Sequence, residues 1–218
     1  MRAALCVLVV LGAAAATPAP APAQRLAIGA SVWGAGVKAR SVYPGGREAV
    51  SGPVLGFDAR VSMGRWGLRL GYGEGRLDPD TLGPEPRDYV DGSIDVSFRP
   101  VPTLEIGLGP YARAYTTDRG TQRWLFWQLR ARYEAGIITP DVRGYAEVWS
   151  GFAGTVNAAE AYDGSRGGAA GLQWRVSRFK GAPVTLTIGY LIDESRAGGG
   201  TRRETVERTW LALGVGRI

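Results

Sequence analysis

Residues 54–73 read VLGFDARVSMGRWGLRLGYG, and apolar and polar side chains alternate along almost the whole stretch. Successive side chains of a β-strand point to opposite faces, so this spacing predicts two strands, each with one apolar and one polar face. Gly64 and Arg65 separate the two runs and predict a tight turn. The stretch therefore indicates an antiparallel hairpin with an apolar face and a charged face.

The same alternation recurs along the rest of the chain. Each segment is close to the 9–11 residues that a tilted strand needs to cross the hydrocarbon of a bilayer. We therefore predict an all-β fold, an antiparallel up-and-down transmembrane β-barrel of about ten strands, with eight as the alternative. The other predicted strands lie near residues 25–38, 89–99, 104–108, 123–134, 142–149, 172–177, 184–192 and 205–218.

The connections between these segments predict how the barrel is oriented. Short links alternate with longer ones that are polar or rich in glycine and proline. Barrels of the outer membrane have short periplasmic turns and long external loops, and an even number of strands brings both chain ends to the periplasm. The predicted external loops are residues 40–53, 75–88, 116–122, 155–168 and 194–204.

The beginning of the chain has the order of a secretory signal peptide. Arg2 is followed by an apolar run over residues 3–16 and then by Ala21-Pro22-Ala23. This run is shorter than the roughly 20 residues that a spanning helix needs. We expect cleavage after Ala23, which makes residues 1–23 the signal peptide and residues 24–218 the barrel domain. The single cysteine, Cys6, leaves with the signal.

Composition narrows the function. The chain has no histidine, which excludes a Ser-His-Asp triad and a metal site built on histidine. The net charge is +6, but the basic residues are scattered instead of forming the stripe expected of a nucleic-acid-binding protein. We expect no catalytic residue, no metal, no cofactor and no nucleic-acid partner.

Together, the signal, the alternation and the loop asymmetry resemble the small bacterial outer-membrane β-barrel proteins over residues 25–218. The resemblance implies a location in the outer membrane, the lipid bilayer as a partner, and external loops that could bind a surface ligand; it leaves the oligomeric state open. Barrel enzymes of this topology include omptin proteases, outer-membrane phospholipase A and lipid A deacylases. All of them use a histidine, so their mechanisms do not carry over. Such barrels often end in an aromatic residue that the insertion machinery recognises, whereas this sequence ends in Gly216-Arg217-Ile218.

The polar faces of the predicted strands carry both signs of charge. In a narrow lumen, opposite charges most simply form ion pairs that fill the interior. Asp91 and Asp95 stand four apart on one strand and face the same way, which makes them the candidates for carboxylate chemistry. The predicted lumen charge network consists of Asp58, Arg60, Arg69, Asp91, Asp95, Glu105, Arg113, Arg130, Arg132, Glu134, Arg143, Glu147 and Arg175.

Three functions fit this pattern. The first is a non-enzymatic barrel whose lumen is largely plugged by arginine–carboxylate pairs, with a structural or surface-interaction role. The second is a narrow channel for small or anionic solutes, suggested by the excess of arginine in the lumen. The third is a secreted, lipocalin-like binding barrel, which requires the apolar faces to point inward.

Overall fold

The computed structural model describes residues 26–80, 85–137, 139–158 and 160–216, so the predicted signal peptide lies outside the described residues. The described chain forms ten strands, which confirms the larger of the two predicted strand numbers. They are β1 (Leu26–Tyr43), β2 (Gly46–Met63), β3 (Trp66–Pro79), β4 (Arg87–Val101), β5 (Leu104–Thr117), β6 (Gly120–Gly136), β7 (Val142–Val156), β8 (Tyr162–Phe179), β9 (Ala182–Ala197) and β10 (Arg202–Gly216).

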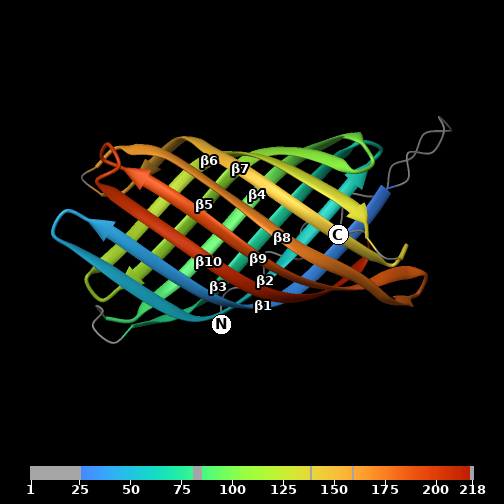
Figure 1. The fold of residues 1–218 in the computed structure, drawn as a ribbon, viewed down its shortest axis with the longest axis horizontal. Coiled ribbons are helices and arrows are strands. Elements are labelled where there is room, and N and C mark those ends of the chain that lie inside the picture. The colour runs from blue at the N-terminus through green and yellow to red at the C-terminus, as the bar shows by residue number, and fades with distance from the viewer. Residues whose placement is uncertain (1–25, 81–84, 138, 159, 217–218) are drawn as a thin grey trace, which may run out of the picture.

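Each strand pairs antiparallel with the next, and β1 pairs with β10 to close the ring (Figure 1). The predicted fold class, an antiparallel up-and-down barrel, is confirmed. Closure satisfies the backbone hydrogen bonds of every strand and leaves no sheet edge, as a bilayer requires. No helix in the described part of the chain is long and apolar enough to cross a membrane.

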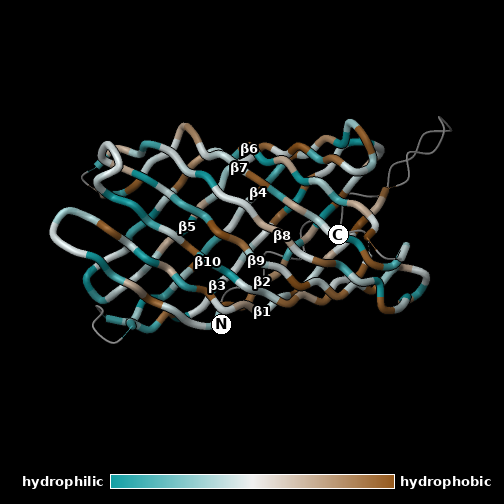
Figure 2. Tube along the Cα trace, viewed as in Figure 1, coloured by the Kyte–Doolittle hydropathy of each residue, from teal (hydrophilic) through white to brown (hydrophobic). Residues whose placement is uncertain are grey.

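Apolar side chains face outward along the strands. Val32, Leu55 and Val148 are 64%, 69% and 61% exposed, whereas the neighbouring Ser31 and Glu147 are buried inside the barrel. Figure 2 shows the corresponding alternation of hydrophobic and hydrophilic residues along the strands. The lipocalin-like alternative requires the opposite arrangement, with the apolar faces inward, so the structure corrects it.

The predicted external loops are for the most part strand. Residues 40–53 contain only a two-residue turn, Pro44 and Gly45, between β1 and β2, and Asp118 and Arg119 connect β5 to β6 in the same way. Beyond the apolar band both faces of a strand can be polar, so the alternation fades while the hydrogen-bonded ladder continues. The barrel wall therefore extends past its apolar band, and the predicted loop boundaries are wrong.

The outward apolar band makes a testable prediction about lipid contact. Val148→Arg on β7 is expected to lower the free energy of unfolding in lipid vesicles by about 2 kcal/mol, because an arginine on the lipid face loses hydration. Thr155→Arg, an exposed position at the polar end of the same strand, is the control and should change it by less than about 0.5 kcal/mol. Equal effects of the two substitutions in urea titrations would contradict a membrane-embedded band.

Candidate functional site

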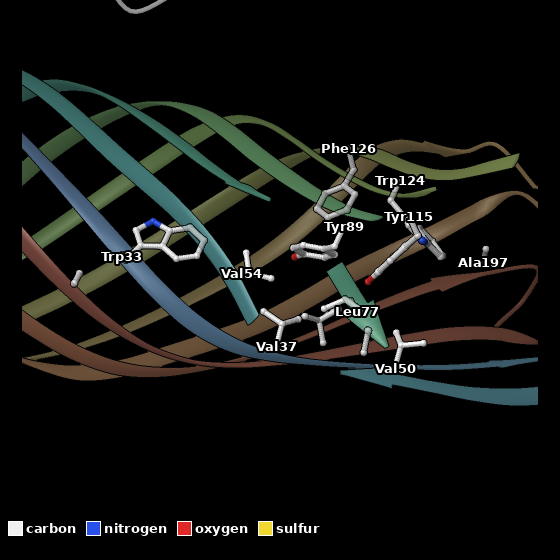
Figure 3. Close-up of a cluster of buried hydrophobic side chains, with 13 residues drawn as sticks. Trp33, Val37, Val50, Val54, Leu77, Tyr89, Tyr115, Trp124, Phe126 and Ala197 are labelled. Carbon is white, nitrogen blue, oxygen red and sulfur yellow. The ribbon is translucent and has the colours of Figure 1, made fainter. Parts of the chain in front are cut away.

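The lumen holds the candidate site. The half of the lumen remote from Leu26 and Gly216, where the described strands begin and end, contains an aromatic cluster. We define this cluster as Tyr89, Tyr111, Tyr115, Trp124 and Phe126. The ring centroids of Tyr89 and Tyr115 are 5.4 Å apart, and those of Tyr111 and Phe126 are 5.2 Å apart. Figure 3 shows four of these side chains gathered inside the barrel, with aliphatic side chains beside them and Trp33 apart. This part of the lumen is a packed, largely apolar core.

A fully buried arginine lies within this core. Arg113 on β5 donates from Nη2 to Asp193 Oδ2 at 2.5 Å and to Ser195 Oγ at 3.2 Å, and its Nε lies 3.3 Å from Glu204 Oε1. The side chain of Arg113 is 0% exposed. These four residues form what we call the Arg113 centre. Asp193 and Ser195 lie on β9 and Glu204 lies on β10, so the contacts cross the lumen.

The aromatic cluster and a nearby tryptophan complete the hydrogen bonding of the two carboxylates. Tyr115 Oη and Trp124 Nε1 each donate to Glu204 at 3.1 Å, and Trp149 Nε1 donates to Asp193 at 2.7 Å. Hydrogen-bond donors and an arginine partner offset the loss of hydration of buried carboxylates. The Arg113 centre is therefore held in place by the same rings that surround it.

Glu147 on β7 is the centre of a second group of ion pairs, closer to the end of the barrel where Leu26 and Gly216 lie. Its carboxylate lies 2.9 Å from Arg130, 3.3 Å from Arg132 and 3.7 Å from Arg69. Arg130 also lies 3.4 Å from Asp95. Arginines from β3 and β6 thus converge on one buried carboxylate of β7, and Arg130 also connects it to β4.

Further ion pairs connect most of the remaining predicted residues. Glu105 accepts from Arg99 at 2.7 Å and pairs with Arg60. Three more contacts link Arg69 to Asp58 at 3.9 Å, Arg132 to Glu134 at 3.7 Å and Arg143 to Glu134 at 2.9 Å.

Arg175 lies apart from the rest of the predicted network. Its guanidinium pairs with Asp141 of the connection between β6 and β7, and 40% of its side chain is exposed. This pair lies at the rim of the barrel, at the end where Leu26 and Gly216 lie, and does not cross the lumen.

Asp91 and Asp95, the proposed pair for carboxylate chemistry, face different partners. Asp91 pairs with Arg208 of β10 and accepts a 3.2 Å hydrogen bond from Tyr111, whereas Asp95 faces Arg130. A general acid and base need carboxyl groups that share a substrate, and each of these carboxylates is occupied by a guanidinium. The geometry therefore favours charge pairing at both positions.

A central cavity of about 170 Å³ separates the Arg113 centre from the ion pairs around Glu147. This volume is large enough to hold several water molecules. Arg113 Nη1 and Arg130 Nε are buried without a hydrogen-bond acceptor in the described residues, and both side chains line this cavity. Ordered water is the simplest partner for such donors. The part of the chain that the structure describes holds no group of three carboxylates able to bind a metal ion.

The charge analysis of the sequence missed several residues of this site. Arg208, Asp193 and Arg99 stand on the lumen face of their strands, and their parity along β10, β9 and β4 was the available signal. Glu204 falls inside a predicted loop, so the alternation along the strands could not assign it to the lumen face.

No protein-family model and no curated protein matches this sequence. Among solved structures, the outer membrane protease OmpT of Escherichia coli is similar, with a TM-score of 0.53 and 10% identity over 88% of this chain and 97% of that chain. Neisserial surface protein A gives a TM-score of 0.44 at 12% identity, covering 85% of this chain and 96% of that one. An outer membrane channel of Pseudomonas putida F1 gives 0.46 at 11% identity, covering 92% and 100%. The chain has the fold of an outer-membrane β-barrel protein.

Proposed function

We propose that this chain is a non-enzymatic outer-membrane barrel whose lumen is closed to solutes and whose role is structural or at the cell surface. One observation carries the proposal: the contacts of the Arg113 centre run across the full width of the barrel. Arg113 on β5 and Glu204 on β10 belong to strands five places apart in the ring of ten. The buried rings of the aromatic cluster surround this contact, and little room is left for a solute to pass.

The charge pairing in the lumen also supports closure over conduction. The arginine excess suggested a path for anions, but each lumen arginine has a carboxylate within 4.0 Å. Paired charges cancel most of the field that would concentrate an anion. In the described residues, the arginines with such a partner include Arg60, Arg69, Arg87, Arg99, Arg113, Arg130, Arg132, Arg143 and Arg208.

Conductance across planar bilayers tests the closed lumen. The native protein is expected to show no single-channel steps, because Tyr89, Tyr115, Trp124 and Phe126 are buried side chains that fill this part of the lumen. Tyr89→Ala with Tyr115→Ala and Trp124→Ala removes three lumen rings and should produce steps. The matched control removes the outward-facing rings of Trp127, Tyr133 and Tyr190 and should stay silent.

The conductance test has a folding control and a milder variant. Folding of each variant is checked by the mobility shift between unboiled and boiled samples on SDS gels, and Tyr115→Ser alone serves as the milder variant. Anion-selective steps from the native protein would overturn the proposal in favour of the narrow channel.

The surface role rests on the wall that extends past the apolar band. The turns of β1–β2 and β5–β6 lie at the end of the barrel remote from Leu26 and Gly216, where the described strands begin and end (Figure 1). This end is the external one in outer-membrane barrels. A surface ligand would meet these turns first. We further propose that export removes residues 1–23, which N-terminal sequencing of the mature protein would test by finding Gln24 first.

A further inference from the structure

The outer face of β8 and β9 changes from apolar to charged at one level, whereas the outward residues of β10 are already polar from Thr209 to Arg203. On β9 the outward side chains of Ile188, Tyr190 and Ile192 are half exposed, and the next outward residue is Glu194. On β8 the change comes at Arg166, which is the register partner of Glu194. This level marks the edge of the apolar band that faces the β1–β2 and β5–β6 turns, on this side of the barrel.

Three arginines surround Glu194 at that edge. Arg196 Nε donates to Glu194 Oε1 at 2.6 Å, Arg166 Nη2 lies 3.4 Å from the same oxygen, and Arg203 Nε lies 3.7 Å from Oε2. Arg196 and Arg203 are register partners on neighbouring strands. We call Arg166, Arg196 and Arg203 the basic cluster.

The basic cluster has more charge than its carboxylate can balance. Burial alone would raise the pKa of Glu194, but the hydrogen bond from Arg196 and the charges of all three arginines hold it below its ordinary value. The group therefore carries two net positive charges at neutral pH. The three arginine side chains are 70%, 36% and 51% exposed, in chain order, so their remaining donors face the surroundings.

The opposite side of the barrel differs at the same level. Above the outward apolar residues of β3 and β4, the outward side chains are Glu74, Asp78 and Asp88, with Arg76 among them. An anion would therefore be attracted to the β8–β10 side and repelled from the β3–β4 side.

We propose that the basic cluster binds the phosphate of a membrane lipid whose acyl chains lie along the apolar faces of β8 and β9. Guanidinium groups bind phosphate oxygens with paired, charge-assisted hydrogen bonds. A ligand that reaches both the cluster and the apolar residues directly below it needs an anionic head and an apolar tail. A zwitterionic head group would bring its own cation towards the three arginines and bind more weakly. The proposal rests on the membrane setting of the proposed function and is independent of whether the lumen is closed.

Native mass spectrometry of the folded protein in non-ionic detergent tests this site. The probes are phosphatidic acid, phosphatidylcholine with the same acyl chains, and inorganic phosphate. Phosphatidic acid should be retained and the other two should not. The variant Arg166→Gln, Arg196→Gln, Arg203→Gln should bind phosphatidic acid roughly 100-fold more weakly, at about 1 kcal/mol for each basic residue near a lipid surface.

The matched control removes the same charge from scattered outward positions. Arg47→Gln, Arg76→Gln, Arg123→Gln should keep the native affinity, and a loss equal to that of the cluster variant would overturn the site in favour of a general charge effect. Equal retention of phosphatidylcholine would overturn the phosphate contact, and equal retention of inorganic phosphate would overturn the lipid as the ligand. Gel mobility before and after boiling establishes that both variants fold. A failure of the closed lumen would be seen separately, as conductance of the native protein.

Discussion

Arg113→Met is expected to lower the free energy of unfolding by about 3–5 kcal/mol. The substitution keeps much of the side-chain volume and removes the charge, which leaves Asp193 and Glu204 buried without their cation. Both residues are 5% exposed or less, so water cannot readily solvate them. The measurement is urea unfolding in detergent micelles or lipid vesicles, followed by tryptophan fluorescence, since Trp124 and Trp149 donate hydrogen bonds to these carboxylates.

Arg143→Met is the matched control for this prediction. Arg143 also pairs with a carboxylate, Glu134 at 2.9 Å, but 57% of its side chain is exposed. Exposed ion pairs contribute little, so the expected loss is below about 1 kcal/mol. Adding Asp193→Asn and Glu204→Gln to Arg113→Met should recover part of the lost stability, because no charge is then left unpaired. An Arg113→Met protein as stable as the native one would show that water solvates the Arg113 centre.

The strands and their faces could be predicted because the period of a strand is two residues. Phe57 and Asp58 stand side by side in the sequence, and no antiparallel barrel can turn both towards lipid. A slip of one residue would exchange the two faces along the whole strand, so the pattern fixes the register strongly. The same argument placed Arg60 and Arg130 on the lumen side, where they are buried in the structure.

The partners of these charges could not be predicted from the pattern. Arg113 and Glu204 are 91 positions apart in the sequence and meet only because β5 and β10 lie opposite each other in the closed ring. Their common height in the lumen depends on the stagger of every strand between them. The ends of the strands could not be predicted either. Beyond the apolar band both faces of a strand are polar, and such a sequence cannot be distinguished from a loop.

The aromatic cluster breaks the rule that the lumen face is polar. Tyr89, Trp124 and Phe126 point inward and are almost fully buried. Together they make this end of the lumen packed and largely apolar. Side chains on a packed lumen face follow the rules of a protein core, where large apolar groups stabilise and polar groups need partners. The sequence pattern separates the two faces of a strand but does not show which face is wet.

Glycine is a second feature whose meaning depends on the third dimension, and Gly109 makes the point testable. Gly107 and Gly109 both lie on β5, are both buried and point into the lumen. A Cβ at Gly107 would find its nearest neighbour at 3.8 Å. A Cβ at Gly109 would overlap the carbonyl oxygen of Ile94 and lie 2.8 Å from the Cα of Asp95. At Gly109, β4 and β5 lie so close together that no residue type other than glycine fits without moving the backbone.

Gly109→Ala is therefore expected to cost at least about 3 kcal/mol, because β4 and β5 must separate to admit one methyl group. Gly107→Ala should change the free energy of unfolding by less than about 1 kcal/mol, since it places the same methyl group in ordinary contact and reduces the freedom of the unfolded chain. The two variants have the same composition, so differences in strand propensity and hydrophobicity cancel when they are compared. Urea titrations measured side by side should separate them by about 2 kcal/mol or more. Equal stabilities would mean that the wall of the barrel yields at Gly109 without losing its strand pairing.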